Sequence, residues 1–110
     1  MTIIEIEEVE GSVYNSLHDE KTALDMTLKA DLVHQILAFK EMNDLNQTQL
    51  GELIDMDQAD VSRMLRGNFR NIAVSKILNC LSKLSYDVDI LLKPHPVANE
   101  TGVVRVLETA

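Results

Sequence analysis

The chain has little cysteine and no long apolar run, and each shortage excludes a class of protein. Cys80 is the single cysteine among 110 residues, so an internal disulfide and a cysteine-ligated metal cluster are excluded. No apolar run approaches the roughly 20 residues that a bilayer-spanning helix needs. The first isoleucines alternate with glutamates, unlike a secretory leader. We therefore expect a cytoplasmic protein with no membrane partner.

Glycine, proline and aromatic residues are also scarce. The chain has 4 glycines, 2 prolines and 4% aromatic residues, beside 45% hydrophobic residues. This composition is typical of a single globular domain rich in helix. Cys80 falls within the apolar pattern of the run 77–84, so we expect it to be a small buried hydrophobe and not a reactive thiol.

Charge is unevenly distributed along the chain, although the total of −8 is acidic. Residues 1–60 hold 14 acidic and 3 basic residues, a balance of −11. Residues 61–86 hold 5 basic residues and no acidic one. A phosphate backbone responds to the field within a Debye length of about 8 Å, not to the total charge. The basic window is therefore compatible with a nucleic-acid partner, the alternative being a solvated basic face that binds nothing.

Apolar periodicity predicts four helices. The first begins at about Leu24 and ends at Asn43 and Asp44, with Leu45 packing back. Asn46 is expected to cap the second helix in a capping box with Gln49. The predicted inner residues of the second, third and fourth helices are Leu50, Leu53, Ile54, Val61, Met64, Leu65, Ile77, Leu78, Leu81 and Leu84.

The junction between the second and third helices has the residues of a tight turn. Asp55 tolerates a left-handed conformation, Met56 offers an apolar plug, and Asp57 is expected to cap the third helix. Gly67 supplies the stop of the third helix. The fourth helix is expected over about 73–84.

Two runs alternate with period two and predict extended structure. Residues 2–10 indicate a weak strand or an extended arm, and residues 86–93 indicate a strand ended by Pro94. A lone strand leaves its backbone groups unpaired, so the 86–93 strand needs a partner. Candidates are the same strand of a second subunit, Val103–Leu107, or Ile3–Val9.

Two short helices joined by a tight turn, over 46–67, are a way to place side chains in the major groove of DNA. On the outer face of the third helix, Gln58 suits adenine, while Arg63 or Arg66 suits guanine. Asp60 would repel a phosphate and could accept a hydrogen bond from a cytosine amine. The full set of predicted DNA-binding residues is Gln47, Gln58, Ala59, Ser62, Arg63, Arg66, Asn68 and Arg70.

The run 45–67, LNQTQLGELIDMDQADVSRMLRG, resembles the HTH XRE (Cro/C1-type) DNA-binding family, and within it the HigA-type antitoxins. The likeness continues through VSKILNCLSKL at 74–84 and YDVDILLKP at 86–94, and upstream through 12–36. It implies a homodimer, base contacts by residues 58, 59, 62 and 63, and phosphate contacts by Gln47 and Arg70. Asp55 and Ser85 stand where relatives often have glycine, and Ala73 where a capping serine is common.

The expected architecture is mainly α, a lambda-repressor-like helix-turn-helix bundle of four to five helices followed by a short C-terminal β-strand used in dimerisation. We expect an N-terminal arm over 1–22, the DNA-binding domain with the dimerisation strand (about 86–93) over 23–94, and a tail over 95–110.

The sequence predicts a sequence-specific transcriptional regulator, a dimeric repressor bound to a palindromic operator in double-stranded DNA. The alternatives are an antitoxin that neutralises a small basic ribonuclease toxin and autoregulates its operon, and a scaffold module without DNA affinity. We expect no enzyme, no cofactor and no metal. The three histidines share no ligand spacing, and the loop 55–60 lacks the glycine and closing glutamate of an EF-hand.

Overall fold

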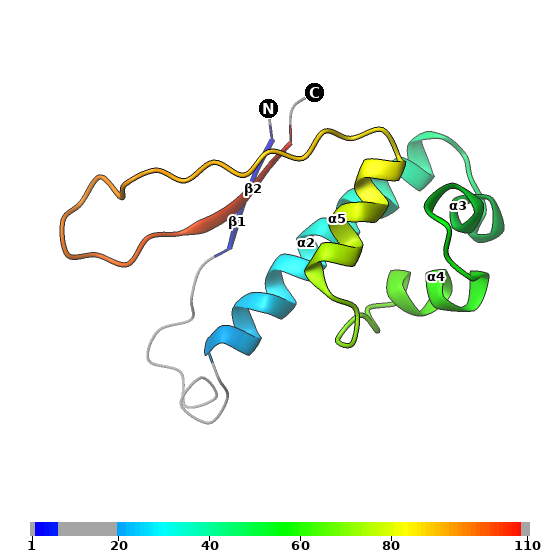
Figure 1. Cartoon of the computed structure of the whole chain (residues 1–110), viewed down its shortest axis with the longest axis horizontal. Helices are drawn as coiled ribbons and strands as arrows, with labels where there is room; N and C mark the ends of the chain where they lie inside the picture. Colours follow the sequence, from blue (N-terminus) through cyan, green and yellow to red (C-terminus); the bar gives the residue numbers. More distant parts are fainter. Residues whose placement is uncertain (1, 7–19, 109–110) are drawn as a thin grey trace. The chain divides into compact units, whose positions relative to one another are not determined.

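The computed structural model describes the backbone of residues 2–6 and 20–108, with side chains from Ala23 onward (Figure 1). The chain divides into two compact units. One unit is residues 29–88, and the described part of the other is 2–6, 20–28 and 89–108. Each is described by itself below.

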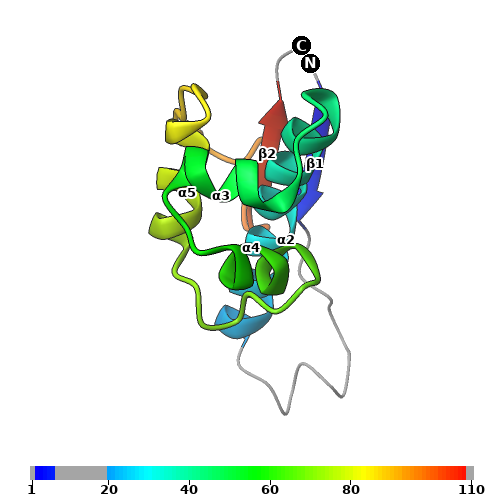
Figure 2. The same cartoon turned by 90° about the vertical axis from the view of Figure 1, so that its right-hand side faces the viewer.

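The described residues form four helices in succession: α2 (Glu20–Met42), α3 (Gln47–Ile54), α4 (Gln58–Leu65) and α5 (Val74–Lys83). In the unit 29–88, α3 packs against both α4 and α5 (Figure 2). The expected mainly α, helix-turn-helix architecture is confirmed. No helix in the described part of the chain combines the length and the apolar character that crossing a bilayer requires.

The core of this unit is apolar and draws on all four helices. Ile36, Leu50, Val61, Met64 and Ile77 are each 0% exposed. Further core residues are Leu32, Val33, Ile54, Phe69, Cys80, Leu81 and Leu84. Burial raises the pKa of the Cys80 thiol, so the cysteine behaves as the buried hydrophobe that its position predicted.

Two residues expected in the inner faces lie at the edge of the core, and one lies outside it. Leu65 and Leu78 are half-buried. Leu53 is 48% exposed, so its placement on the inner face of α3 was wrong. The buried residues of α3 are Leu50, Gly51 and Ile54. The buried face of the helix is therefore centred nearer to Gly51 than expected, and Leu53 lies beside it.

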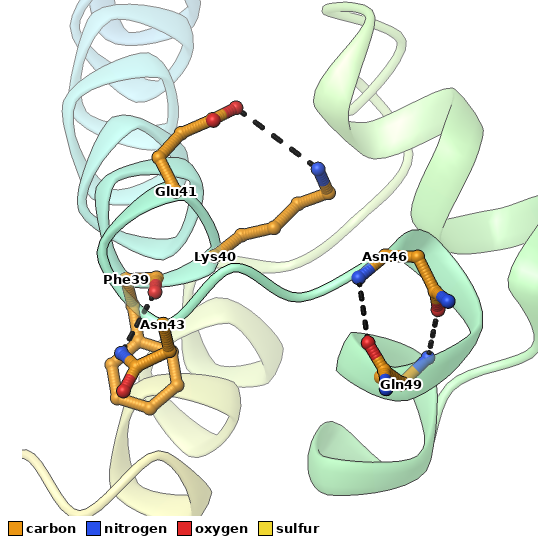
Figure 3. Close-up of polar contacts among 6 residues, drawn as sticks. All are labelled: Phe39, Lys40, Glu41, Asn43, Asn46 and Gln49. Carbon is orange, nitrogen blue, oxygen red and sulfur yellow. Dashed lines mark hydrogen bonds and ion pairs between the residues drawn. The ribbon is translucent and has the colours of Figure 1, made fainter.

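The start of α3 is fixed by the capping box that the sequence predicted (Figure 3). The backbone amide of Gln49 donates to Asn46 Oδ1 at 2.8 Å, and the backbone amide of Asn46 donates to Gln49 Oε1 at 2.9 Å. Asp57 and Ala73 occupy the cap positions of α4 and α5, but neither makes a side-chain capping bond. The predicted position of Asp57 is right, and the expected side-chain bond is absent.

Each helix is followed by a residue in the left-handed region, where only Gly67 is a glycine. The other three residues are Asp44, Asp55 and Ser85, with φ of 53°, 55° and 70°. After α4 the amides of Gly67 and Asn68 return to carbonyls of the last turn, and the same pattern follows α2 and α5. Asp55 and Ser85 thus adopt a conformation that glycine reaches at lower steric cost.

The turn between α3 and α4 depends on a close backbone contact at Gly51. A Cβ at this position would lie 2.5 Å from the carbonyl oxygen of Met56 and 3.4 Å from Cγ2 of Val61. The amide of Met56 also donates to the carbonyl of Gly51 at 2.9 Å. Glycine therefore lets the chain return directly over α3 before α4 begins, with Met56 half-buried in the turn.

In the other unit, β1 (Thr2–Ile6) pairs antiparallel with β2 (Val104–Glu108), in the register Thr2↔Glu108 to Ile6↔Val104. The alternation at the start of the chain thus forms a strand over 2–6, and residues 7–10 lie outside the described residues. The predicted strand at 86–93 is not present in the single chain. The reason is that β1 and β2, which contain most of the described part of the two candidate partners within the chain, pair with each other instead.

Substitution Gly51→Ala is expected to lower the free energy of unfolding by about 1–3 kcal/mol, because backbone atoms of Met56 must shift. Alanine in an open helical position would instead stabilise by up to about 1 kcal/mol. Gly102→Ala is the matched control, since a Cβ there meets nothing within 4 Å. Urea unfolding measures both variants, and a Gly51→Ala protein as stable as wild type would contradict the close contact.

Candidate nucleic-acid interface

The outer face of α4 is exposed along its length. Val61 and Met64 anchor the helix in the core, and the residues between them turn outward. Of the predicted base-contacting residues, Ser62 is half-buried and the others are exposed: Gln58, Ala59, Arg63 and Arg66. The structure therefore presents donors, acceptors and a small residue on one accessible helix.

Gln47 and Gln58 are brought together although eleven residues separate them. Gln58 Nε2 donates to Gln47 Oε1 at 3.2 Å, which links the first residue of α3 to the first residue of α4. This bond uses one donor of Gln58 and leaves its carbonyl oxygen and second amide hydrogen available. An amide held in this way has one preferred orientation, with donor and acceptor side by side.

Arg63 is paired with Asp60 on the same helix. Arg63 Nη2 donates to Asp60 Oδ1, and the two side chains are 54% and 53% exposed. Asp60 lies in the first turn of α4, where a carboxylate is also favoured by the helix dipole. The ion pair places a positive group and a negative group next to each other on the exposed face.

The segment after α4 is held by two buried side chains from different parts of the chain. Phe69 is 8% exposed and packs inward, and Lys29 of α2, which is 5% exposed, donates from Nζ to the carbonyl of Arg70 at 3.0 Å. With these two residues fixed, Asn68 and Arg70 are exposed on either side of Phe69. Asn68 and Arg70, two of the predicted DNA-binding residues, are thus exposed on an anchored loop.

The basic window is accessible as well as basic. All five of its cationic residues are exposed: Arg63, Arg66, Arg70, Lys76 and Lys83. Lys83 Nζ lies 3.8 Å from Asp55 Oδ2, and Arg66 Nε donates to the carbonyl of Ser62 at 3.3 Å. In the part of the chain that the structure describes, no group of three or more metal-ligating side chains is found.

Three features of this surface were missed from the sequence. Gly51 had a usable signal, because a lone glycine within a helical pattern often marks a close approach. Lys29 had none, since its partner lies 41 residues away. The pairing of Asp60 with Arg63 follows from their i, i+3 spacing on a helix.

Comparison with family models matches residues 16–93 to a helix-turn-helix domain. The match includes α2 to α5 and the run that follows α5. Comparisons with curated proteins and with solved structures gave no match.

Proposed function

The chain belongs to the helix-turn-helix domain family, which supports a DNA-binding regulator, and we propose that it is a sequence-specific repressor that binds through α4. The single observation that carries the proposal is the exposed outer face of α4, held at a fixed angle to α3 by the turn at Gly51. Helices of this kind place their N-terminal residues against base edges in the major groove.

The chemistry of the exposed residues fits the groove. Gln58, oriented by Gln47, offers the donor and acceptor that adenine N7 and N6 require. Arg63 or Arg66 suits guanine O6 and N7, and Ala59 and Ser62 are small enough to lie close to a base edge. We propose that Gln47, Asn68 and Arg70 hold the phosphate backbone near the two ends of α4.

Arg63→Ala and Arg70→Ala should weaken DNA binding in different ways. Loss of the base contact by Arg63 is expected to cost about 1–3 kcal/mol on a selected duplex and to relax the preference at one base pair. Loss of the phosphate contact by Arg70 should weaken binding to all duplexes and reduce the salt slope by about 1.

Fluorescence anisotropy on selected and scrambled duplexes at several salt concentrations separates these effects. Lys40→Ala, which removes one positive charge from the last turn of α2, outside α4, its anchored loop and residues 86–93, is the control for net charge. Equal affinities for wild type, Arg63→Ala and Arg70→Ala would contradict the proposed interface.

The repressor is proposed to be a homodimer joined through residues 86–93. Within this run Ile90, Leu91 and Leu92 are 77%, 74% and 87% exposed, and no strand of the described chain pairs with it. A second copy would pair the backbone and cover these side chains. Two α4 helices separated by one DNA turn, about 34–36 Å, would then match a palindromic operator.

Ile90→Lys should dissociate the dimer, because a charged residue at a strand edge opposes pairing. Val97→Lys is the matched control, since Val97 is also exposed (51%) but lies outside the run. Sedimentation equilibrium is expected to give a dimer for wild type and Val97→Lys and a monomer for Ile90→Lys. A monomeric wild type, or a dimeric Ile90→Lys, would contradict this interface.

A second candidate function, an antitoxin that binds a small basic ribonuclease toxin and represses its own operon, is favoured by the acidic first half of the chain. Residues 1–60 carry a balance of −11. Among residues 29–60 the exposed acidic residues are Glu41, Asp44, Glu52, Asp55, Asp57 and Asp60. Such a surface suits a basic protein partner.

The test of this role is co-expression with the product of the adjacent gene. The expected neighbour is a basic protein of one domain, about 100 residues. The antitoxin role predicts that the two proteins form a complex that survives gel filtration and weakens as the salt concentration rises. Ribonuclease activity of the neighbour should fall in the complex. A neighbour that elutes separately and keeps its activity would contradict the antitoxin role and leave the repressor proposal untouched.

A further inference from the structure

The ion pair between Asp60 and Arg63 has a consequence for how the proposed interface distinguishes DNA sequences. Asp60 is the only acidic residue between Gln58 and Tyr86, and it lies in the first turn of α4 beside the base-contacting positions. Arg63 is the only arginine or lysine within α4 itself. Within α4, the one acidic side chain is therefore paired with the one cationic side chain.

The ion pair between Asp60 and Arg63 is expected to add little to the stability of the fold. Both side chains are more than half exposed, and ion pairs in such positions contribute little to folding because water screens them. A weak pair has one property that matters at an interface, namely that Arg63 can leave Asp60 when a better acceptor is offered. The group that then lies next to the Asp60 carboxylate decides which acceptors Arg63 prefers.

We infer that Asp60 is a specificity-determining residue that restricts Arg63 to guanine and suppresses its use on phosphate. This inference rests on the proposed function of α4. A phosphate that approaches Arg63 also approaches the carboxylate of Asp60, and like charges repel at this range. Guanine O6 and N7 carry no net charge, so they accept from Arg63 without that repulsion.

A neighbouring cytosine adds an attraction. In the major groove each G·C pair presents the guanine acceptors beside the N4 amine of cytosine, which is a donor. Asp60 accepts from that amine while Arg63 donates to guanine, so the two side chains match the two halves of the G·C pattern. An A·T pair offers no such arrangement, since its donor lies on adenine N6 next to an acceptor N7.

Arg66 and Asp57 provide the internal comparison. Arg66 donates through Nε to the carbonyl of Ser62, and among the described residues it has no ion pair. Asp57 occupies the N-cap position of α4 but makes no side-chain capping hydrogen bond. It lies three residues before Asp60, and both side chains are exposed. Replacing Asp57 therefore removes the same charge from the same end of the helix without releasing Arg63.

The test measures the affinity of the full-length protein for two duplexes, one selected by wild type from a random library and one with the same composition in scrambled order. Asp60→Asn should tighten binding to the scrambled duplex and increase its salt slope by about 0.9, the value for one further phosphate contact. The ratio of selected to scrambled affinity should fall about tenfold, within the range of one bidentate base contact. Asp57→Asn should change both affinities by the same factor.

A third variant separates the ion pair from a general charge effect. In an Arg63→Ala background, Asp60→Asn should no longer alter the salt slope on the scrambled duplex, because the released cation is gone. Circular dichroism of every variant checks that the helices are intact, and Asp60→Glu, which keeps the charge, should restore most of the affinity ratio.

The outcomes are distinguishable. If wild type binds both duplexes equally, the proposed function and this inference are both overturned. If wild type discriminates but Asp60→Asn and Asp57→Asn change the two affinities alike, only this inference is overturned. If Asp60→Asn lowers thermal stability but leaves the ratio unchanged, Asp60 serves the helix dipole alone and the inference is wrong.

Discussion

The surface proposed to contact DNA depends on the close backbone approach between Gly51 and Met56. A Cβ on residue 51 would lie 2.5 Å from the carbonyl oxygen of Met56, which is too close. The path of the chain from α3 to α4 therefore requires glycine at this position. Asp55 in the left-handed region completes the reversal, and Val61 and Met64 then fix which side of α4 is buried. Gln58, Ala59 and Arg63 therefore lie on the exposed side of α4, and Arg66 is exposed directly after it.

A second dependency links the loop after α4 to α2. Lys29 donates to the carbonyl of Arg70, and Phe69 is buried, so the backbone that carries Asn68 and Arg70 is tied to the core at residues 69 and 70. The interface is thus anchored at its centre by Val61 and Met64 and at its end by this loop. The overall charge of the chain is −8, yet residues 61–86 contain no acidic residue and present five exposed cations. The local position of the charges therefore matters more for this surface than the total charge of the chain.

Local sequence signals predicted most of the helical unit, because caps and turns depend on neighbouring residues. The box of Asn46 with Gln49, the left-handed Asp55 and the stop at Gly67 are all present as expected. Leu53 was placed wrongly, since periodicity alone does not show that Gly51 takes the buried position.

Long-range pairing was harder to predict. The alternation at 86–93 predicted a strand, yet β1 and β2 pair with each other and this run has no strand pairing in the single chain. Partner choice between strands depends on the whole topology, so the sequence left three candidates open. The bond from Lys29 to Arg70 spans 41 residues and has no local signal at all. The roles of the eight predicted DNA-binding residues remain predictions.

The most direct test of the central claim, that the outer face of α4 is the surface that meets DNA, is an NMR titration with amide resonances assigned. On addition of a selected duplex, the account predicts that the largest shifts occur at Gln47, along 58–66 and at Asn68 and Arg70. Amides of the exposed stretch Glu41–Asp44 at the end of α2 should change little. Shifts concentrated on that stretch, with α4 unaffected, would contradict the account.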